Sequence, residues 1–167
     1  MLVVFDTTFL VPLLDPQVKG MGEVDARISH LVATLDRQKA KIVIPTPALS
    51  EVLIGASDAA PAYLEILSKN SRFRIAPFGE RAAVEAAARH REAMRLGDKK
   101  EGSLNWSKVK FDRQIVAIAR VEGAELIYSN DNDIKRLGAS DGIEVIMLDA
   151  LELPPATTPD LFDFGKK

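Results

Sequence analysis

The chain has 167 residues, enough for one domain with a sizeable core and too few for a second full domain. Hydrophobic residues make up 47% and charged residues 28%, as in an ordinary globular protein, and the net charge of −2 argues against binding nucleic acid through bulk positive charge. The absence of cysteine excludes disulfides, zinc–thiolate sites and cysteine nucleophiles, so any metal must be bound by oxygen or histidine.

The first segment, MLVVFDTTFLVPLLD, is apolar, but Asp6 interrupts it and no basic leader precedes it. This pattern fits neither a signal peptide nor a transmembrane helix. We therefore expect a cytoplasmic protein with no membrane contact.

Short apolar runs alternate with longer helical segments along the chain, a pattern typical of an α/β fold. The runs are mostly apolar throughout, as expected for strands that are buried on both faces of a parallel sheet. The predicted strands are Leu2–Phe5, Lys41–Ile44, Phe73–Ala76, Glu125–Tyr128 and Glu144–Met147.

Two helices are predicted in the first half of the chain. An apolar stripe with spacings of four, three and four indicates a helix from about Glu23 to Arg37, and it consists of Val24, Ile28, Leu31 and Leu35. Thr46 followed by Pro47 resembles an N-cap with proline in the first helical position. The helix that begins there would carry Glu51 one turn in.

Two further helices are predicted in the second half. Residues Glu80 to Leu96 are rich in alanine and are followed by Gly97, which suits a helix that ends at a glycine cap. A later helix is indicated by a stripe of apolar residues and would carry Asp112 in its first turn; the stripe consists of Phe111, Ile115 and Ile118.

The end of the chain differs in composition from the rest. Residues from Leu153 to Lys167 include three prolines and show little periodicity. We predict a single domain over residues 1–150 and an extended C-terminal tail over residues 151–167.

Two of the predicted strands end at carboxylates. The first runs directly into Asp6, and the fourth is followed by Ser129, Asp131 and Asp133. In an open parallel sheet, ligand sites lie beyond the carboxyl ends of the strands near the topological switch point. These acids would therefore converge if the two strands are neighbours.

Glu51 and Asp112 would extend this group if their helices enter from the same edge of the sheet. A cluster of four or five carboxylates is unfavourable without a counter-ion, because like charges at short range repel and raise one another's pKa. Ligation by oxygen alone suits Mg²⁺ or Mn²⁺. Such an ion activates water and offsets charge on a leaving oxygen, so the pattern favours metal-dependent cleavage of phosphodiesters.

Each acid also has an ordinary structural explanation. Glu51 by itself suits a helix surface, Asp112 could favour a helix N-terminus, and residues 129–133 could be a polar turn that caps the next helix. Asp6 is more telling, since a buried carboxylate without a partner is costly. The two histidines, His30 and His90, are expected at the surface of amphipathic helices. With only two histidines and no nucleophile motif, the sequence argues against a Ser-His-Asp hydrolase.

Four segments resemble, in order, the acidic motifs of PIN-domain nucleases: FDTTFL at 5–10, PTPALSEVL at 45–53, FDRQIVAIA at 111–119 and SNDNDIKRL at 129–137. The similarity is greatest to VapC-type toxins of bacterial and archaeal toxin–antitoxin modules. It implies a three-layer α/β/α domain with a central parallel sheet and helices on both faces. It further implies Mg²⁺ or Mn²⁺ dependence, endonucleolytic cleavage of RNA, a cognate antitoxin and a homodimer.

The resemblance also assigns roles to individual residues. The invariant acids of the family, which are catalytic and bind the metal, correspond to Asp6, Glu51, Asp112 and Asp131. Supporting roles fall on Asp133 as a supplementary acid and on two hydroxyl positions that help to order the site and its water, Thr7 and Ser129.

The chain departs from compact members of the family by its tail and by extra residues around Gly97 to Lys110. The stretch Arg89 to Arg113 contains eight Lys or Arg against four acids. It could guide an RNA backbone toward the metal, with Trp106 stacking on an unpaired base. Alternatively, it is a solvated helix face and loop with Trp106 in the core.

Two other functions stay open at this point. A phosphatase of the haloacid-dehalogenase type also begins with a strand that ends in aspartate, but it needs a second aspartate where this chain has Thr8. A catalytically silent PIN-like module that only binds a partner is the other alternative. The complete set of acids argues against it.

Overall fold

The computed structural model describes residues 1–17, 22–98 and 105–155. Over these residues the chain forms a five-stranded sheet with the order β3-β2-β1-β4-β5, in which all neighbouring strands are parallel. The strands are β1 (Leu2–Phe5), β2 (Lys41–Pro45), β3 (Phe73–Ala76), β4 (Leu126–Tyr128) and β5 (Glu144–Ile146). The predicted parallel sheet is confirmed, and each strand lies within one residue of its expected bounds.

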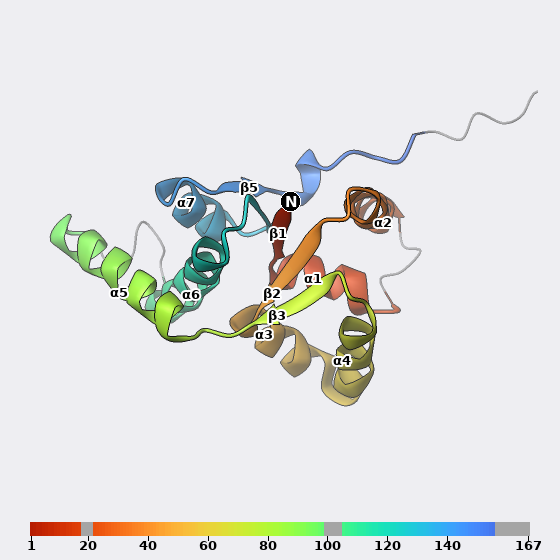
Figure 1. The fold of residues 1–167 in the computed structure, drawn as a ribbon, viewed down its shortest axis with the longest axis horizontal. Helices are drawn as coiled ribbons and strands as arrows, with labels where there is room; N and C mark the ends of the chain where they lie inside the picture. The colour runs from red at the N-terminus through yellow and green to blue at the C-terminus, as the bar shows by residue number, and fades with distance from the viewer. Residues whose placement is uncertain (18–21, 99–104, 156–167) are drawn as a thin grey trace, which may run out of the picture.

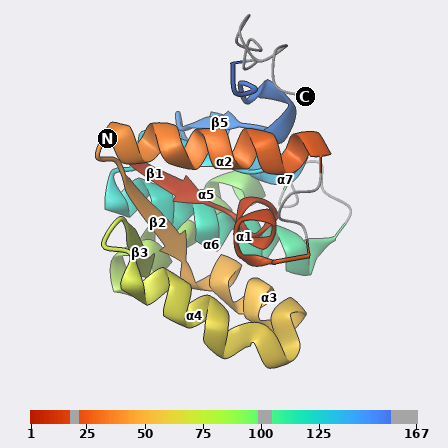
Figure 2. The same ribbon diagram turned by 90° about the vertical axis from the view of Figure 1, so that its right-hand side faces the viewer.

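Helices cover both faces of this sheet, which confirms the three-layer α/β/α architecture (Figures 1 and 2). Helices α1, α2 and α4 lie on one side, and α5, α6 and α7 lie on the other; α3 follows β2 and contacts both α1 and α6. The helices are α1 (Thr7–Leu14), α2 (Gly22–Arg37), α3 (Thr46–Ala56), α4 (Ala60–Lys69), α5 (Glu80–Arg95), α6 (Trp106–Glu122) and α7 (Asn132–Ser140), with short 3₁₀ turns at Ser57–Ala59 and Leu148–Ala150.

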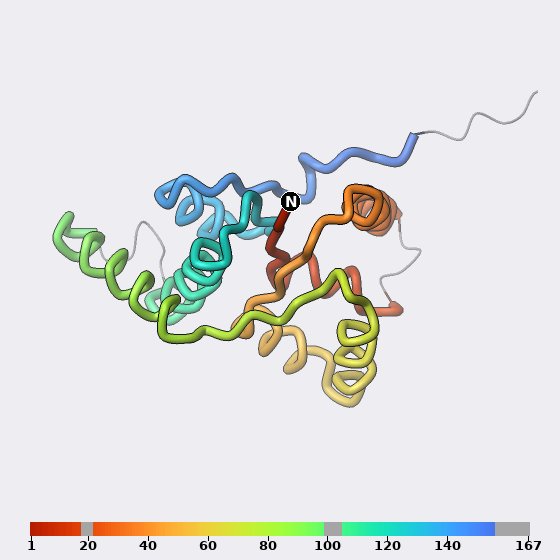
Figure 3. The backbone as a smooth tube through the Cα atoms, in the orientation of Figure 1, coloured from red at the N-terminus to blue at the C-terminus, as the bar shows by residue number. Residues whose placement is uncertain are grey.

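The path of the chain explains this division. It builds the sheet outward from β1 through β2 to β3, then returns through α5 and α6 to place β4 on the other side of β1 (Figure 3). Connections between parallel strands are almost always right-handed, so reversing the direction of growth moves the helices to the opposite face. The order therefore reverses between β1 and β4, and this is the switch point of the sheet.

The central strands form the middle of the hydrophobic core. Val3, Val4 and Phe5 of β1 are fully buried, and the aromatic ring of Phe5 packs against those of Phe9 and Tyr128. Strands that are buried on both faces lack the alternation of half-exposed strands. This explains why short apolar runs were sufficient to locate them.

Two helix starts differ from the prediction. Thr46 is the first residue of α3 rather than its N-cap, which is Pro45; the Thr46 hydroxyl instead accepts the backbone N–H of Phe78 at 3.1 Å. Helix α6 begins at Trp106 because the side chain of Asn105 caps it. Asp112 consequently lies in the second turn of α6 and not in the first.

Two helices, α1 and α4, were not predicted from the sequence. Helix α1 is one apolar run in which Phe9, Leu10 and Leu14 are fully buried, so it has no polar face to give a periodic signal. Helix α4 buries only Tyr63 and Leu67. Phe111, which we assigned to the buried stripe of α6, is 43% exposed.

The first residues after position 150 pack on the domain. Leu151 is buried, and its carbonyl oxygen accepts a hydrogen bond from the guanidinium of Arg27 in α2. Residues 151–155 contain no helix or strand, and the predicted tail beyond them lies outside the described residues. The division of the chain at residue 150 stays a prediction. Among the described residues, no helix has the length and apolarity needed to cross a membrane.

Candidate active site

The ends of β1 and β4 lie side by side at the switch point. Phe5 pairs with Tyr128, and the backbone N–H of Asp6 donates to the Tyr128 carbonyl at 3.1 Å. The turn that follows β1 is therefore adjacent to the turn that follows β4, which is where an open parallel sheet binds ligands. The expected convergence of the two strand ends is confirmed.

Asp6 is the most buried acid at this edge, at 4% exposure. Its Oδ2 atom accepts hydrogen bonds from the hydroxyls of Ser129 at 2.8 Å and Thr8 at 3.3 Å. Burial raises the pKa of the Asp6 carboxyl; the hydrogen bond from Ser129 opposes this effect, and the nearby charges of Glu51 and Asp131 add to it. Asp6 is thus a carboxylate whose ionised form is costly and is held by two hydroxyl donors.

The same two hydroxyls connect the neighbouring turns. Ser129 Oγ accepts the backbone N–H of Asp131 at 3.1 Å, and Thr8 Oγ1 accepts that of Asn130 at 2.8 Å. Ser129 therefore joins the turn after β4 to Asp6, and the supporting role that the resemblance assigned to it stays a prediction. Thr8 was missed as a supporting residue, although its place two residues after Asp6 in a DTT sequence is a signal for a local hydrogen bond.

Glu51 approaches the site from α3. Its Oε2 atom accepts a hydrogen bond of 2.7 Å from the hydroxyl of Thr7, the first residue of α1. The Thr7 hydroxyl also lies 3.3 Å from the carbonyl oxygen of Ala48. Thr7 therefore links the acid of α3 to the segment that carries Asp6, and this contact gives its hydroxyl a position at the site.

Three further acids form a compact group. Asp112, Asp131 and Asp133 each offer one carboxylate oxygen, and these oxygens all lie within 4.8 Å of one another. Asp131 is also the N-cap of α7, since its Oδ1 accepts the backbone N–H of Asp133 at 2.7 Å. The cap and the cluster are thus compatible, because one carboxylate serves both through different oxygens.

A lysine that the sequence reasoning did not single out lies among these acids. The Nζ atom of Lys108 is 2.8 Å from Asp112 Oδ2, 2.7 Å from Asp131 Oδ2 and 2.9 Å from Asp133 Oδ2. Arg136 adds a second cation, with Nη2 2.8 Å from Asp133 Oδ1. Only the spacing of four residues between Lys108 and Asp112 on one helix could have indicated part of this arrangement.

Burial and charge act against each other in this group. Burial raises the pKa of the Asp112 carboxyl to about 6, although the hydrogen bond and charge of Lys108 work to lower it. Burial alone would lower the pKa of Lys108, but its hydrogen bonds to the three carboxylates raise the pKa above the ordinary value for lysine. Lys108 is consequently a firmly protonated cation at neutral pH.

The side chains fit a hard divalent cation. Three carboxylate oxygens at this spacing are ligands of the kind that Mg²⁺ and Mn²⁺ prefer, and the ammonium of Lys108 already shows that the group accepts a cation. The structure brings all four predicted acids to one edge of the sheet. Of these, Asp112 and Asp131 join Asp133 in the compact group, whereas Asp6 and Glu51 are held beside it by hydroxyl donors.

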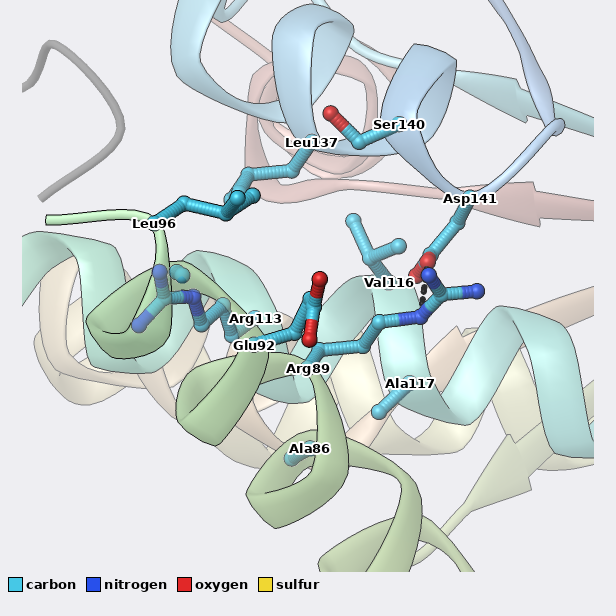
Figure 4. Close-up of a pocket in the computed structure, with 11 residues that line it drawn as sticks. Ala86, Arg89, Glu92, Leu96, Arg113, Val116, Ala117, Leu137, Ser140 and Asp141 are labelled. Carbon is cyan, nitrogen blue, oxygen red and sulfur yellow. Dashed lines mark ion pairs between the residues drawn. The ribbon is translucent and has the colours of Figure 1, made fainter. Parts of the chain in front are cut away.

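The basic segment is largely engaged with the protein itself. A pocket of about 270 Å³ lies between α5, α6 and α7, and in Figure 4 Arg89 and Asp141 point toward each other across it, with Nε and Oδ1 2.5 Å apart. Arg113 is buried and contacts His90. None of the predicted acids lines this pocket, which is therefore separate from the acid cluster.

Trp106 and His90 pack against each other at the junction of α5 and α6. Their rings pack together with centroids 4.7 Å apart, and both side chains are partly buried. His90 is thus partly exposed and packs against Trp106, and Trp106 rests against α5 rather than in the sheet core. Two cations of the basic segment, Lys99 and Lys100, lie outside the described residues.

Comparison with known proteins gives a family match and several similar structures. A model of the PIN domain matches residues 3–140. A chain of VapBC2 from Rickettsia felis, bound to a promoter DNA fragment, is 17% identical and has a TM-score of 0.64, with 88% of this chain and 98% of that chain covered. DNA-bound VapBC from Salmonella typhimurium is 18% identical, with coverages of 89% and 99% and a TM-score of 0.59.

A third similar structure is Mycobacterium tuberculosis VapC20, described as a toxin that cleaves the sarcin-ricin loop. It is 18% identical, with 81% of this chain and 95% of that chain covered and a TM-score of 0.58. No curated protein matches the sequence. At these identities the structural likeness establishes a shared fold.

Proposed function

Because this chain belongs to the PIN domain family, we propose that it is a metal-dependent endoribonuclease whose catalytic and metal-binding acids are Asp6, Glu51, Asp112 and Asp131. The observation that carries this proposal is the meeting of these acids at the switch point of the sheet, where carboxylate oxygens of Asp112, Asp131 and Asp133 lie within 4.8 Å of one another. The metal would be Mg²⁺ or Mn²⁺, since all the donors are oxygens.

The residues of the site would have two tasks, to hold the metal ion and to orient the attacking water. Asp112 and Asp131, with Asp133 as a supplementary acid, would form the compact part of the metal site, and Asp6 and Glu51 would complete it. The cation, when bound, activates water and offsets charge on the leaving oxygen. Asp6 is fixed by Ser129 and Thr8, and Glu51 is fixed by Thr7. Carboxylates held in this way would orient water for in-line attack on a phosphodiester of RNA.

We further propose that the protein is the toxin of a type II toxin–antitoxin module, with a cognate antitoxin as partner and a homodimer as its assembly. The similar structures from Rickettsia felis and Salmonella typhimurium are VapBC proteins bound to DNA, and VapC20 is described as a toxin that cleaves the sarcin-ricin loop. A small neighbouring gene for a DNA-binding antitoxin would support this role. A monomer by light scattering at high micromolar concentration would contradict the dimer.

The nuclease domain would comprise residues 1–150, with residues 151–167 as a tail. The match of the PIN model to residues 3–140 supports these limits. The same match does not favour a phosphatase of the haloacid-dehalogenase type. The presence of all four acids argues against a silent binding module.

The test is cleavage of a single-stranded RNA with Mn²⁺ or Mg²⁺, compared with the same reaction in excess EDTA. We expect cleavage that requires the metal and no release of phosphate from a simple phosphomonoester. Asp6→Asn should remove the activity, and Asp58→Asn, at an exposed position of the first 3₁₀ turn, is the matched control that should retain it. Equal cleavage in EDTA would overturn the proposal, and phosphomonoester hydrolysis would favour the phosphatase.

A further inference from the structure

Lys108 neutralises acids from two different helices. It lies in the first turn of α6, where Asn105 accepts its backbone N–H, and its ammonium contacts Asp112 one turn further along and both Asp131 and Asp133 at the start of α7. An ordinary pair at a spacing of four residues on a helix surface would involve one acid and contribute little. Here one cation is shared by three carboxylates that are mostly buried.

The oxygens that face Lys108 are the ones that a metal would need. Asp131 uses Oδ1 to cap α7, and Asp133 uses Oδ1 to accept a hydrogen bond from Arg136. Their Oδ2 atoms are directed to Lys108 Nζ, as is Oδ2 of Asp112. An ammonium and a divalent cation cannot occupy the centre of the same three oxygens together.

We propose that Lys108 competes with the divalent metal for the carboxylates of Asp112, Asp131 and Asp133 and thereby sets the metal affinity of the active site. The inference rests on the proposed function only in that a metal binds at this group. Lys108 holds the three acids together when the metal is scarce. When the metal binds, the ammonium leaves, which a flexible and 39% exposed side chain can do without movement of α6.

Competition predicts two opposite effects of one substitution. Without Lys108, three carboxylate oxygens within 4.8 Å lack their shared cation, so the metal-free protein should melt at a lower temperature. The same change removes the competitor, so Mn²⁺ should bind more tightly. A purely structural role of Lys108 would lower stability without any gain in metal affinity.

The experiment is calorimetric titration of Mn²⁺ into the wild type and three variants. Lys108→Met should lower the Kd about tenfold or more, since about 1.4 kcal/mol corresponds to tenfold and hydrogen bonds to charged groups contribute at least that much. Lys108→Arg keeps a competing cation and should stay near the wild type. Lys135→Met removes the same charge from an exposed position on α7. It controls for the effect that the loss of any nearby positive charge has on Mn²⁺ binding.

A measurement on the wild type avoids dependence on the folding of a variant. An amine-reactive reagent, followed by mass spectrometry of the peptides, should modify Lys108 faster when Mn²⁺ is present, with no matching change at Lys135. The inference would be overturned if the Kd for Mn²⁺ were unchanged or higher in Lys108→Met. It would also be overturned if Lys108 reacted at the same rate with and without Mn²⁺. Tighter Mn²⁺ binding by Lys108→Met would support it even if RNA cleavage were not found, so the two proposals can fail separately.

Discussion

The Nζ atom of Lys108 lies 2.8 Å from Oδ2 of Asp112, one turn further along the same helix. Asp112 is buried, and its pKa is raised to about 6 even beside this cation. The protein therefore contains an acid cluster that is only partly neutralised by its own side chains. The effect of a substitution in this cluster depends on whether it removes a costly charge, a hydrogen-bond donor or a metal ligand.

Asp6→Asn should melt at or above the temperature of the wild type in EDTA at neutral pH. Because burial raises the pKa of Asp6, its ionised form is less stable in the folded than in the unfolded chain, and a neutral amide removes that cost. The amide oxygen can still accept from Ser129 and Thr8. Thermal unfolding measures the effect, and a melting temperature well below that of the wild type would show that the charge stabilises the fold.

Ser129→Ala is the contrasting change at the same contact. It removes the donor to Asp6 and the acceptor of the Asp131 N–H while the buried acid stays. Leaving such groups without partners costs about 1–3 kcal/mol in the free energy of unfolding. Chemical denaturation of the metal-free protein should show this loss. An unchanged midpoint would mean that water replaces the hydroxyl.

The affinity for Mn²⁺ should decrease as the pH falls below about 6. Asp112 has a folded pKa of about 6 against an ordinary value of 3.8, and a protonated carboxyl is a poor metal ligand. The stability of the metal-free protein changes with pH in the opposite direction. The folded state binds the Asp112 proton more tightly than the unfolded state does, so the stability that Asp112 contributes falls as the pH rises from 3.8 to about 6. Titrations across this range, with Asp112→Asn as the variant that lacks the group, provide the measurement.

Asp131→Asn should separate the structural role of this residue from its catalytic one. Asparagine can keep the cap of α7 through its carbonyl oxygen, whereas Asp131→Ala loses the cap and about 0.5–2 kcal/mol of stability. Both variants lack the charged oxygen that faces Lys108, so both should lose RNA cleavage by orders of magnitude. Near-normal activity of the stable Asn variant would exclude Asp131 as a metal ligand.

Thr7→Val tests whether the orientation of Glu51 matters. Valine preserves the shape of the side chain but cannot donate to Glu51 Oε2, which now accepts a hydrogen bond of 2.7 Å. Loss of such a supporting contact typically lowers metal affinity or activity by about 10- to 100-fold. The cleavage rate should fall while the melting temperature changes little, because the contact is exposed. Ser68→Ala, at an exposed position on α4, is the control.

Local sequence was sufficient to locate the strands and several of the helices. Strands such as Leu2–Phe5 and Phe73–Ala76 have the predicted bounds because mostly apolar residues are followed by Asp6 in the first strand and by Pro77 in the second. Asp6 was identifiable because a carboxylate directly after a buried strand requires an explanation. Helix α1 was not identifiable in this way, since a helix that is apolar on every side has no periodic pattern.

The pairing of the acids was decided by the tertiary structure. The sequence placed Asp6 and Asp131 at strand ends, but their meeting depends on β4 lying beside β1, which is a property of the whole sheet. Lys108 shows the same limit more clearly: it is 25 residues from Asp133 in the chain and 2.9 Å from it in space. Periodicity records which side of a segment is buried, whereas the partner of a charged side chain depends on which segments the fold brings together.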